Sequence, residues 1–215
     1  MSRIKKIDKL TDSKYLNMYQ LEAVNRLGGK VDYYVASRAK RTDQLQMKSR
    51  NWNPDGVLIY SLYGEKRDKV LLVRQYRYSI DEYIYEFPAG LVDPGENFRE
   101  AAVREVKEET GLTLHPLAVD EMYEKPYFTT IGMTDESCGT IYGYVDGQIS
   151  KDGLEDNEDI EVVLADRDEV RRILREERVA IMCAYMLMHF LEDEEPFAFL
   201  TSKNICVEEQ NGSKI

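Results

Sequence analysis

The chain has 215 residues, of which 43% are hydrophobic and 32% charged, so it is long enough for one domain with a sizeable core and a small appendage. Its 40 acidic residues outnumber 29 basic ones, giving a formal net charge of -11, which argues against nucleic acid as a partner because such binding depends on Lys and Arg. No apolar run approaches the roughly 20 residues that span a bilayer, so we expect no membrane partner.

Two extended segments open the chain. Residues Lys14–Val24 and Lys30–Ala39 are predicted to be strands, and the turn residues Leu27-Gly28-Gly29 between them indicate a hairpin. Residues 41–55 are polar and are expected to form a connection. We therefore assign residues 1–45 to an N-terminal hairpin.

A single α+β domain is predicted to follow at residues 46–200, with a short tail at 201–215. Its first helix is indicated at Asn97–Thr110, where Phe98, Ala102 and Val106 recur every four residues and Gly111 favours a helix end. The other predicted elements are strands at Gly56–Tyr63, Lys69–Tyr78, Glu82–Phe87, Leu117–Glu124, Thr140–Val145 and Ile160–Leu164, and helices at Asp168–Glu177 and Val179–Glu192.

The cysteines Cys138, Cys183 and Cys206 are widely spaced and form no Cys-x-x-Cys pair. Such thiols are typical of a reduced protein rather than of a disulfide framework or a metal site. The opening MSRIKKIDKL has no apolar stretch after it and does not resemble a secretory signal. We therefore expect a cytoplasmic protein.

Three carboxylates share one surface of the first predicted helix. Glu105 and Glu109 are four residues apart, and Glu108 lies three after Glu105. Like charges at this spacing cost roughly a few tenths of a kcal/mol per pair. A divalent cation would reverse the sign of that cost, and Mg²⁺ typically binds carboxylates together with substrate phosphate oxygens. A merely solvated acidic face is the alternative, and the wider pattern decides against it.

That pattern is GLVDPGENFREAAVREVKEETGL, residues 90–112. It resembles the signature of the Nudix hydrolase family, which is Gly, five residues, Glu, seven residues, then Arg-Glu-apolar-x-Glu-Glu-x-Gly-apolar. The matching positions are Gly90, Glu96, Arg104, Glu105, Val106, Glu108, Glu109, Gly111 and Leu112. The resemblance implies the Nudix fold, a mixed β-sheet between helices, and a magnesium-dependent pyrophosphohydrolase.

The resemblance also implies roles for residues of this segment. Arg104 and Glu96 would orient the acids, and Mn²⁺ would be a possible substitute for Mg²⁺. The implied metal ligands are the backbone carbonyl of Ala89 and the carboxylates of Glu105 and Glu109, with Glu108 as a further ligand or a hydrogen-bond partner.

A general base is expected outside the signature. The ADP-ribose pyrophosphatase group takes this base from an acidic loop before a late strand, and the matching run here is GLEDNEDIEVV. We assign the base to Glu158, with Glu155, Asp156 and Glu136 as alternatives. Removing a proton from the attacking water requires such a group.

The substrate branch is indicated by EFPAGLVDPGE and by RQYR, which resemble ADP-ribose and nucleotide-sugar hydrolases. In that branch Arg77 would contact the substrate diphosphate or ribose, with Glu86 beside the same pocket. N-terminal strands cross between two subunits there, which implies a homodimer. Arg38 would then bind substrate, and Tyr33 and Tyr34 would stack on the base or pack in the dimer core.

One departure keeps the substrate open. ADP-ribose hydrolases commonly carry a Ser-Pro-Gly run in the loop after the signature, whereas this chain has Thr130-Ile131-Gly132. ADP-ribose and other nucleoside diphosphate sugars are therefore both candidates. The alternative is a catalytically silent domain that senses a nucleotide sugar, and the complete acid set favours the enzyme.

Overall fold

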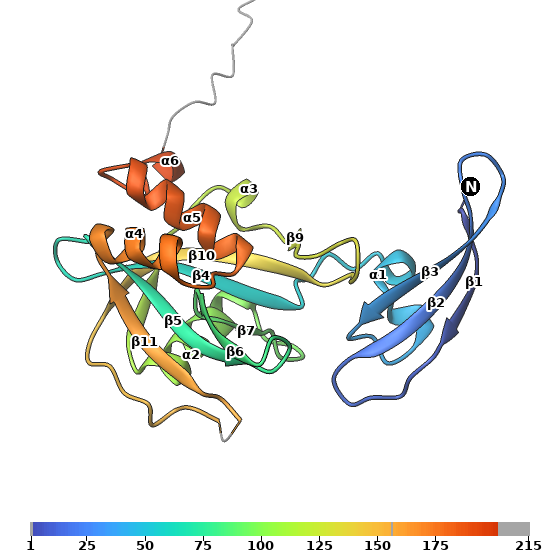
Figure 1. The fold of residues 1–215 in the computed structure, drawn as a ribbon, viewed down its shortest axis with the longest axis horizontal. Coiled ribbons are helices and arrows are strands. Elements are labelled where there is room, and N and C mark those ends of the chain that lie inside the picture. The colour runs from blue at the N-terminus through green and yellow to red at the C-terminus, as the bar shows by residue number, and fades with distance from the viewer. Residues whose placement is uncertain (1, 156, 202–215) are drawn as a thin grey trace, which may run out of the picture.

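The computed structural model describes residues 2–155 and 157–201, which form a large mixed sheet between helices and a small separate sheet at one end (Figure 1). The large sheet has the strand order β11-β5-β4-β10-β8, with β6 paired to β5, β7 to β4 and β9 to β10. Its strands are β4 (Gly56–Tyr63), β5 (Lys69–Arg77), β6 (Glu82–Glu86), β7 (Ala89–Leu91), β8 (Thr113–Pro116), β9 (Tyr127–Phe128), β10 (Ser137–Asp146) and β11 (Ile160–Ala165).

The centre of this sheet is its parallel pair, β4 with β10, in which Ile59 lies opposite Ile141. The other pairings within the sheet are antiparallel. Both strands of the parallel pair are buried for most of their length, as expected for strands covered on both faces. The predicted mixed sheet of an α+β fold is therefore confirmed.

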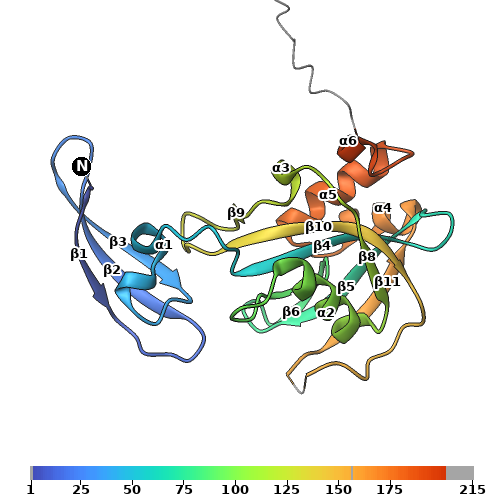
Figure 2. The ribbon, with the colours of Figure 1, turned by 180° about the vertical axis from the view of Figure 1, so that it is seen from behind.

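Helices cover both faces (Figures 1 and 2). Helix α2 (Phe98–Thr110) packs Ala102 and Val106 into the same cluster as Ile59 and Ile141, which explains the four-residue apolar repeat. On the opposite face lie α4 (Arg167–Glu176) and α5 (Ile181–Glu192), followed by the short α6 (Ala198–Thr201). The tail 202–215, with Cys206, lies outside the described residues.

The N-terminal sheet has three strands in the order β1-β2-β3. The predicted hairpin is confirmed as β2 (Asn17–Val24) and β3 (Lys30–Ser37). The first strand, β1 (Ile4–Lys9), was not predicted, because four of its six residues are charged and hide any alternation. It is instead held by antiparallel pairing with β2.

A short connection joins the two sheets through the 3-10 helix η1 (Thr42–Gln44) and helix α1 (Gln46–Ser49). The N-terminal sheet also contacts the loop between β9 and β10. The Ala36 amide donates to the Met133 carbonyl at 2.9 Å, and the Tyr33 hydroxyl donates to the Gly132 carbonyl at 2.6 Å.

The predicted strand Leu117–Glu124 is wrong. The chain leaves β8 at Pro116 and forms helix α3 (Glu121–Glu124). Asp120 caps this helix by accepting from the Met122 amide at 2.9 Å, which stabilises the helical start. None of the helices within the described ranges has the length and apolar character that crossing a bilayer requires.

Candidate active site

Helix α2 carries the acidic residues and both of its ends are fixed by its sequence. Asn97 caps the start by accepting from the Arg99 amide at 2.8 Å, and Glu100 completes a capping box. Gly111 ends the helix with a φ of 75°, a left-handed conformation that favours glycine. The positions of the carboxylates along the helix are therefore set by local sequence.

Strand β7 lies directly against the acidic face of α2. A Cβ atom at Gly90 would lie 1.8 Å from the carboxyl carbon of Glu105, so only glycine fits there. The Glu105 side chain is 12% exposed. Burial raises the pKa of its carboxyl, while the hydrogen bond from Arg104 lowers it. The first glycine of the signature thus makes room for an acid on the neighbouring element.

Arg104 connects four parts of this site. Its Nε donates to Glu96 Oε1 at 3.0 Å and its Nη2 to Glu96 Oε2 at 3.0 Å. Its Nη1 donates to Glu105 at 2.7 Å and to Glu108 at 3.0 Å. Its Nη2 also donates to the Leu91 carbonyl at 3.0 Å. Because an arginine has five N–H donors, these contacts match its full capacity. The predicted salt bridge to Glu108 and the predicted orienting pair with Glu96 are both present.

Glu109 is the most deeply buried acid of helix α2. It is 3% exposed, and its Oε2 atom has no hydrogen-bond partner among the described residues. Burial raises the pKa of this carboxyl well above its ordinary value, and the charges of Glu105 and Glu158 raise it further. A hydrogen bond from the Ala89 backbone and the charge of Arg77 act in the opposite direction. An unpaired buried carboxyl oxygen is costly, so a partner of positive charge would stabilise it.

The loop between β10 and β11 brings Glu158 to this cluster. The Ser150 amide donates to the Thr110 carbonyl at 3.0 Å, and a Cβ at Gly153 would lie 2.7 Å from the Glu108 carbonyl oxygen. The loop therefore packs against the end of α2. Among the predicted bases, Glu158 is the one whose charge raises the pKa of both Glu105 and Glu109.

The far end of the same loop is held by β5 and β6. The Tyr83 hydroxyl donates to the Asp159 carboxylate, and the Tyr76 amide donates to the Asp159 carbonyl at 3.0 Å. The Glu155 amide donates to Glu158 Oε2 at 3.0 Å. Sequence reasoning missed the roles of Tyr83 and Gly153, because both act through contacts with elements far apart in the chain.

Two of the alternative general bases, Glu136 and Asp156, differ from Glu158 in what the structure shows of them. Glu136 forms an ion pair with Arg38, whose Nη2 lies 2.8 Å from Glu136 Oε1. This pair joins the residue directly after β3 to the β9–β10 loop, across 98 residues of sequence. Asp156 lies outside the described residues.

Arg77 and Glu86, the predicted substrate-binding pair, lie together at the β5–β6 hairpin. Arg77 Nε donates to Glu86 Oε2 at 2.6 Å. The guanidinium keeps a side-chain exposure of 44%, and its charge acts on the Glu109 carboxyl. The hairpin thus places one cation beside the acidic cluster and within reach of solvent.

The acidic cluster has features that suit a divalent cation, although its side chains are not yet gathered around one point. Within residues 2–155 and 157–201, no three Asp, Glu, His or Cys side chains are already arranged as a complete metal site. The unpaired Glu109 oxygen and the electrostatic coupling of Glu105, Glu109 and Glu158 nevertheless call for positive charge. Oxygen ligands of this kind suit Mg²⁺, which binds few protein carboxylates and retains other ligands.

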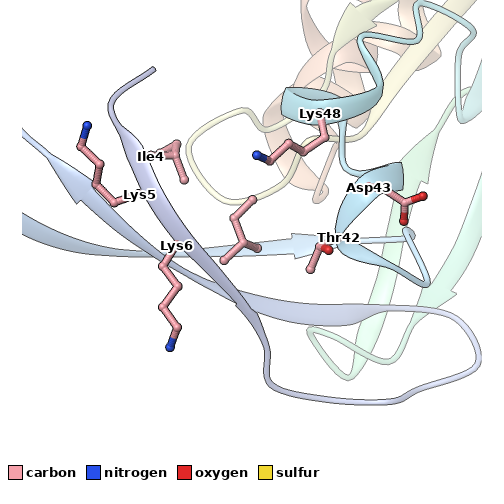
Figure 3. A pocket seen from close by; sticks show the side chains of 7 residues that line it. Ile4, Lys5, Lys6, Thr42, Asp43 and Lys48 are labelled. Carbon is pink, nitrogen blue, oxygen red and sulfur yellow. The ribbon is translucent and has the colours of Figure 1, made fainter. Parts of the chain in front are cut away.

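Two hollows lie near the connection between the sheets. One, of about 440 Å³, is formed by β1 with η1 and α1, where Lys5 and Lys6 point to opposite sides of the strand (Figure 3). It contains no signature residue. The other, of about 480 Å³, extends from Arg38 past Asp55 to Leu91, whose carbonyl binds Arg104. The second hollow therefore borders the acidic cluster.

Comparison with known proteins agrees with this fold. A family model described as the NUDIX domain matches residues 52–184. "Putative nudix hydrolase 2" of Caenorhabditis elegans is 35% identical over 133 residues, covering 57% of this chain and 58% of that protein. "ADP-ribose pyrophosphatase" of Saccharomyces cerevisiae is 28% identical over 157 residues, covering 72% of this chain and 65% of that protein. A crystal structure of an "ADP compounds hydrolase" superposes with a TM-score of 0.60 at 18% identity, covering 91% of this chain and 96% of that one.

The fold is an α+β fold in which a mixed sheet lies between helices. The acidic helix α2 packs against Gly90 of strand β7. Because the family match spans more than half of the sequence, the chain belongs to the NUDIX family. The predicted family and fold are therefore confirmed. The chain matches less than two thirds of the length of the two curated relatives named above.

Proposed function

We propose that this chain hydrolyses the diphosphate of a nucleoside diphosphate sugar such as ADP-ribose, giving a nucleoside monophosphate and a sugar phosphate. The observation that carries the proposal is the buried Glu109 carboxylate, whose Oε2 lacks a partner beside Glu105 and within the charge field of Glu158. The names of several relatives, among them "ADP-ribose pyrophosphatase", support the same substrate class.

Mg²⁺, with Mn²⁺ as a substitute, is the cofactor we propose. When bound, such an ion supplies positive charge to the phosphate oxygens and lowers the pKa of bound water. Arg104 orients the acids through its five hydrogen bonds and, with its donors used, does not contact substrate. The residues proposed to hold the ion are the Ala89 carbonyl, Glu105, Glu108 and Glu109.

The remaining residues bind substrate and move the proton. Glu158 accepts a proton from the attacking water. The water oxygen bonds to phosphorus and the bridging P–O bond breaks. Arg77, held by Glu86, contacts the negatively charged diphosphate. Arg38 reaches the hollow that leads to the acidic cluster and binds the nucleoside side of the substrate.

The first experiment is a substrate panel containing ADP-ribose, UDP-glucose, GDP-mannose, NADH, diadenosine polyphosphates and nucleoside triphosphates, each with Mg²⁺ and with Mn²⁺. We expect selective release of nucleoside monophosphate from one nucleotide sugar. Binding of a nucleotide sugar without turnover would instead favour the sensing alternative.

Glu158→Gln tests the base. Loss of a general base typically costs about 10²- to 10⁴-fold in rate, so we expect a fall of that size in kcat. Glu155→Gln is the matched control on the same loop and should retain activity. A fall with Glu155→Gln and not with Glu158→Gln would move the base to Glu155.

We further propose a cytoplasmic homodimer that does not bind nucleic acid. The free thiols Cys138 and Cys183 suit a reducing compartment. The N-terminal sheet exposes Val31 and Tyr33, at 37% and 41%, which suits packing against a second copy. Tyr33→Asp should lower the mass measured by light scattering, and an unchanged mass would place the interface elsewhere.

A further inference from the structure

Three large apolar side chains stay exposed around one hollow between the connection and the β9–β10 loop. Trp52 is 68% exposed, Phe128 41% and Ile131 61%. The ring centroids of Trp52 and Phe128 are 6.3 Å apart, with the ring planes inclined by 56°. Clustered apolar surface of this kind marks a binding site or an interface.

The hollow has the size and lining of a subsite. It measures about 230 Å³, and Val35 and Met47 add to its apolar walls. Drug-sized ligands occupy roughly 300–1,000 Å³, so this space suits one ring system rather than a whole nucleotide. Gln46 and Arg50, which also line the hollow, have side chains that can hydrogen-bond the edge of such a ring.

Hydrogen bonds between the wall segments of this hollow hold its shape in the absence of a ligand. Phe128 pairs with Ser137 where β9 meets β10, and the Thr129 amide donates to the Glu136 carbonyl at 3.1 Å. The Gln46 amide donates to Asp135 Oδ2 at 3.0 Å, which links the connection to the loop. A preformed pocket loses less entropy on binding, which favours a specific ligand.

The hollow adjoins the candidate active site. Gln46 and Asp135 also line the neighbouring hollow that extends to Leu91. The Leu91 carbonyl accepts from Arg104, which holds Glu105. A ligand with its diphosphate at the acidic cluster would therefore extend along this path toward Trp52.

We propose that the Trp52 pocket, formed by Trp52, Phe128 and Ile131 with Val35, Met47, Gln46 and Arg50, binds the nucleobase of the substrate by stacking. This inference rests on the proposed function. Aromatic stacking changes affinity by roughly 5- to 150-fold per base. This proposal assigns base stacking to Trp52 and Phe128 rather than to Tyr33, whose hydroxyl donates to the Gly132 carbonyl.

Trp52 is the single tryptophan of the chain, so fluorescence excited at the red edge, beyond the absorption of the 15 tyrosines, reports on this pocket. The full chain is titrated with AMP and with ribose 5-phosphate in EDTA, where no turnover occurs. We expect AMP to change the Trp52 emission saturably and ribose 5-phosphate to leave it unchanged. Equal responses to the two ligands would overturn the proposal.

Phe128→Ala should weaken the AMP response about tenfold or more. It should also raise KM for the hydrolysed nucleotide sugar with little change in kcat, because a remote contact is made equally in the ground and transition states. Tyr127→Ala is the matched control, since it removes an exposed ring from the other face of β9 and should leave both values unchanged.

The failures of the two proposals are distinguishable. A change in Trp52 emission with AMP, without hydrolysis of any nucleotide sugar, supports the base-binding pocket and contradicts the proposed enzymatic function. Hydrolysis with no emission change at saturating AMP, and with an unchanged KM in Phe128→Ala, overturns the pocket and leaves the function. Emission that depends on protein concentration and not on AMP also overturns it, because a second copy would then cover Trp52.

Discussion

The signature segment, residues 90–112, and the N-terminal sheet differ in where their side chains find partners. In the segment, Arg104 uses its donors on neighbouring groups and Gly90 gives space to Glu105. In the sheet, Leu27 is 80% exposed and Tyr34 is 50% exposed. The first region is specified by contacts within the domain. The second presents apolar surface that another molecule can cover. The same type of substitution should therefore reduce activity more in the signature segment than in the N-terminal sheet.

The largest difference is expected between Glu105→Gln and Glu22→Gln. Losing a proposed metal ligand should cost several kcal/mol of transition-state stabilisation, on the order of 10³-fold in kcat/KM. Glu22 has a side-chain exposure of 55% on the N-terminal sheet, so its amide variant should retain activity. Steady-state hydrolysis checks both. Comparable losses in the two variants would remove the contrast between the regions.

Gly90→Ala is the next largest effect. Its Cβ would lie 1.8 Å from the Glu105 carboxyl carbon, so the acid must move, and a displacement of about 1 Å can cost about 10²-fold in rate. Gly29→Ala is the matched control in the β2–β3 turn, where the Cβ would meet only the Asn25 side chain, 2.9 Å from its Nδ2. Circular dichroism verifies folding. An active Gly90→Ala variant would show that Glu105 is dispensable or free to move.

Glu109→Gln should stabilise the metal-free protein. Because the folded pKa of Glu109 is raised above 4.5, the folded state binds this proton more tightly, and the free energy of unfolding falls as pH rises from 4.5 toward the folded pKa. Gln does not titrate, so above that window the variant should be more stable by about 1–3 kcal/mol. Urea unfolding in EDTA at several pH values measures this. A variant that is less stable at high pH would contradict the buried, unpaired carboxylate.

The smallest effect is expected from Tyr83→Phe. It removes the hydroxyl that binds Asp159, beside the proposed base, and a hydrogen bond of about 0.5–1.5 kcal/mol corresponds to roughly 2- to 10-fold in kcat. Tyr15→Phe, on an exposed N-terminal loop, is the control. The pH dependence of kcat should also shift in Tyr83→Phe and not in the control. Identical pH profiles would show that Tyr83 has no part in positioning the loop.

Local patterns predicted the elements that carry the chemistry. The apolar repeat of α2 placed Glu105, Glu108 and Glu109 on one helix, and the structure brings Arg104 and Glu96 to them. The strands β4 and β11 were also predicted within one residue of their ends.

Features that depend on distant contacts were not predictable. Strand β7 is three residues long and exists through pairing with β4, and β1 hides its pattern behind charges. The segment after Pro116 reads as extended, yet Asp120 caps a helix and the buried Glu124 binds Arg99. The contact between Gly153 and Glu108 likewise has no local signal.

The charge of the cluster around Arg104 sets an order of events. Arg104 pairs with the carboxyl groups of Glu96, Glu105 and Glu108, and the charge of Arg77 acts on Glu109. When all are ionised, these four carboxylates exceed the two guanidiniums by two formal charges. A bare diphosphate approaching this surface is repelled. For the proposed diphosphate substrate, we therefore expect cations to bind before the substrate or together with it. The arrangement that holds the acids in place would thus also set the order in which the proposed cation and substrate bind.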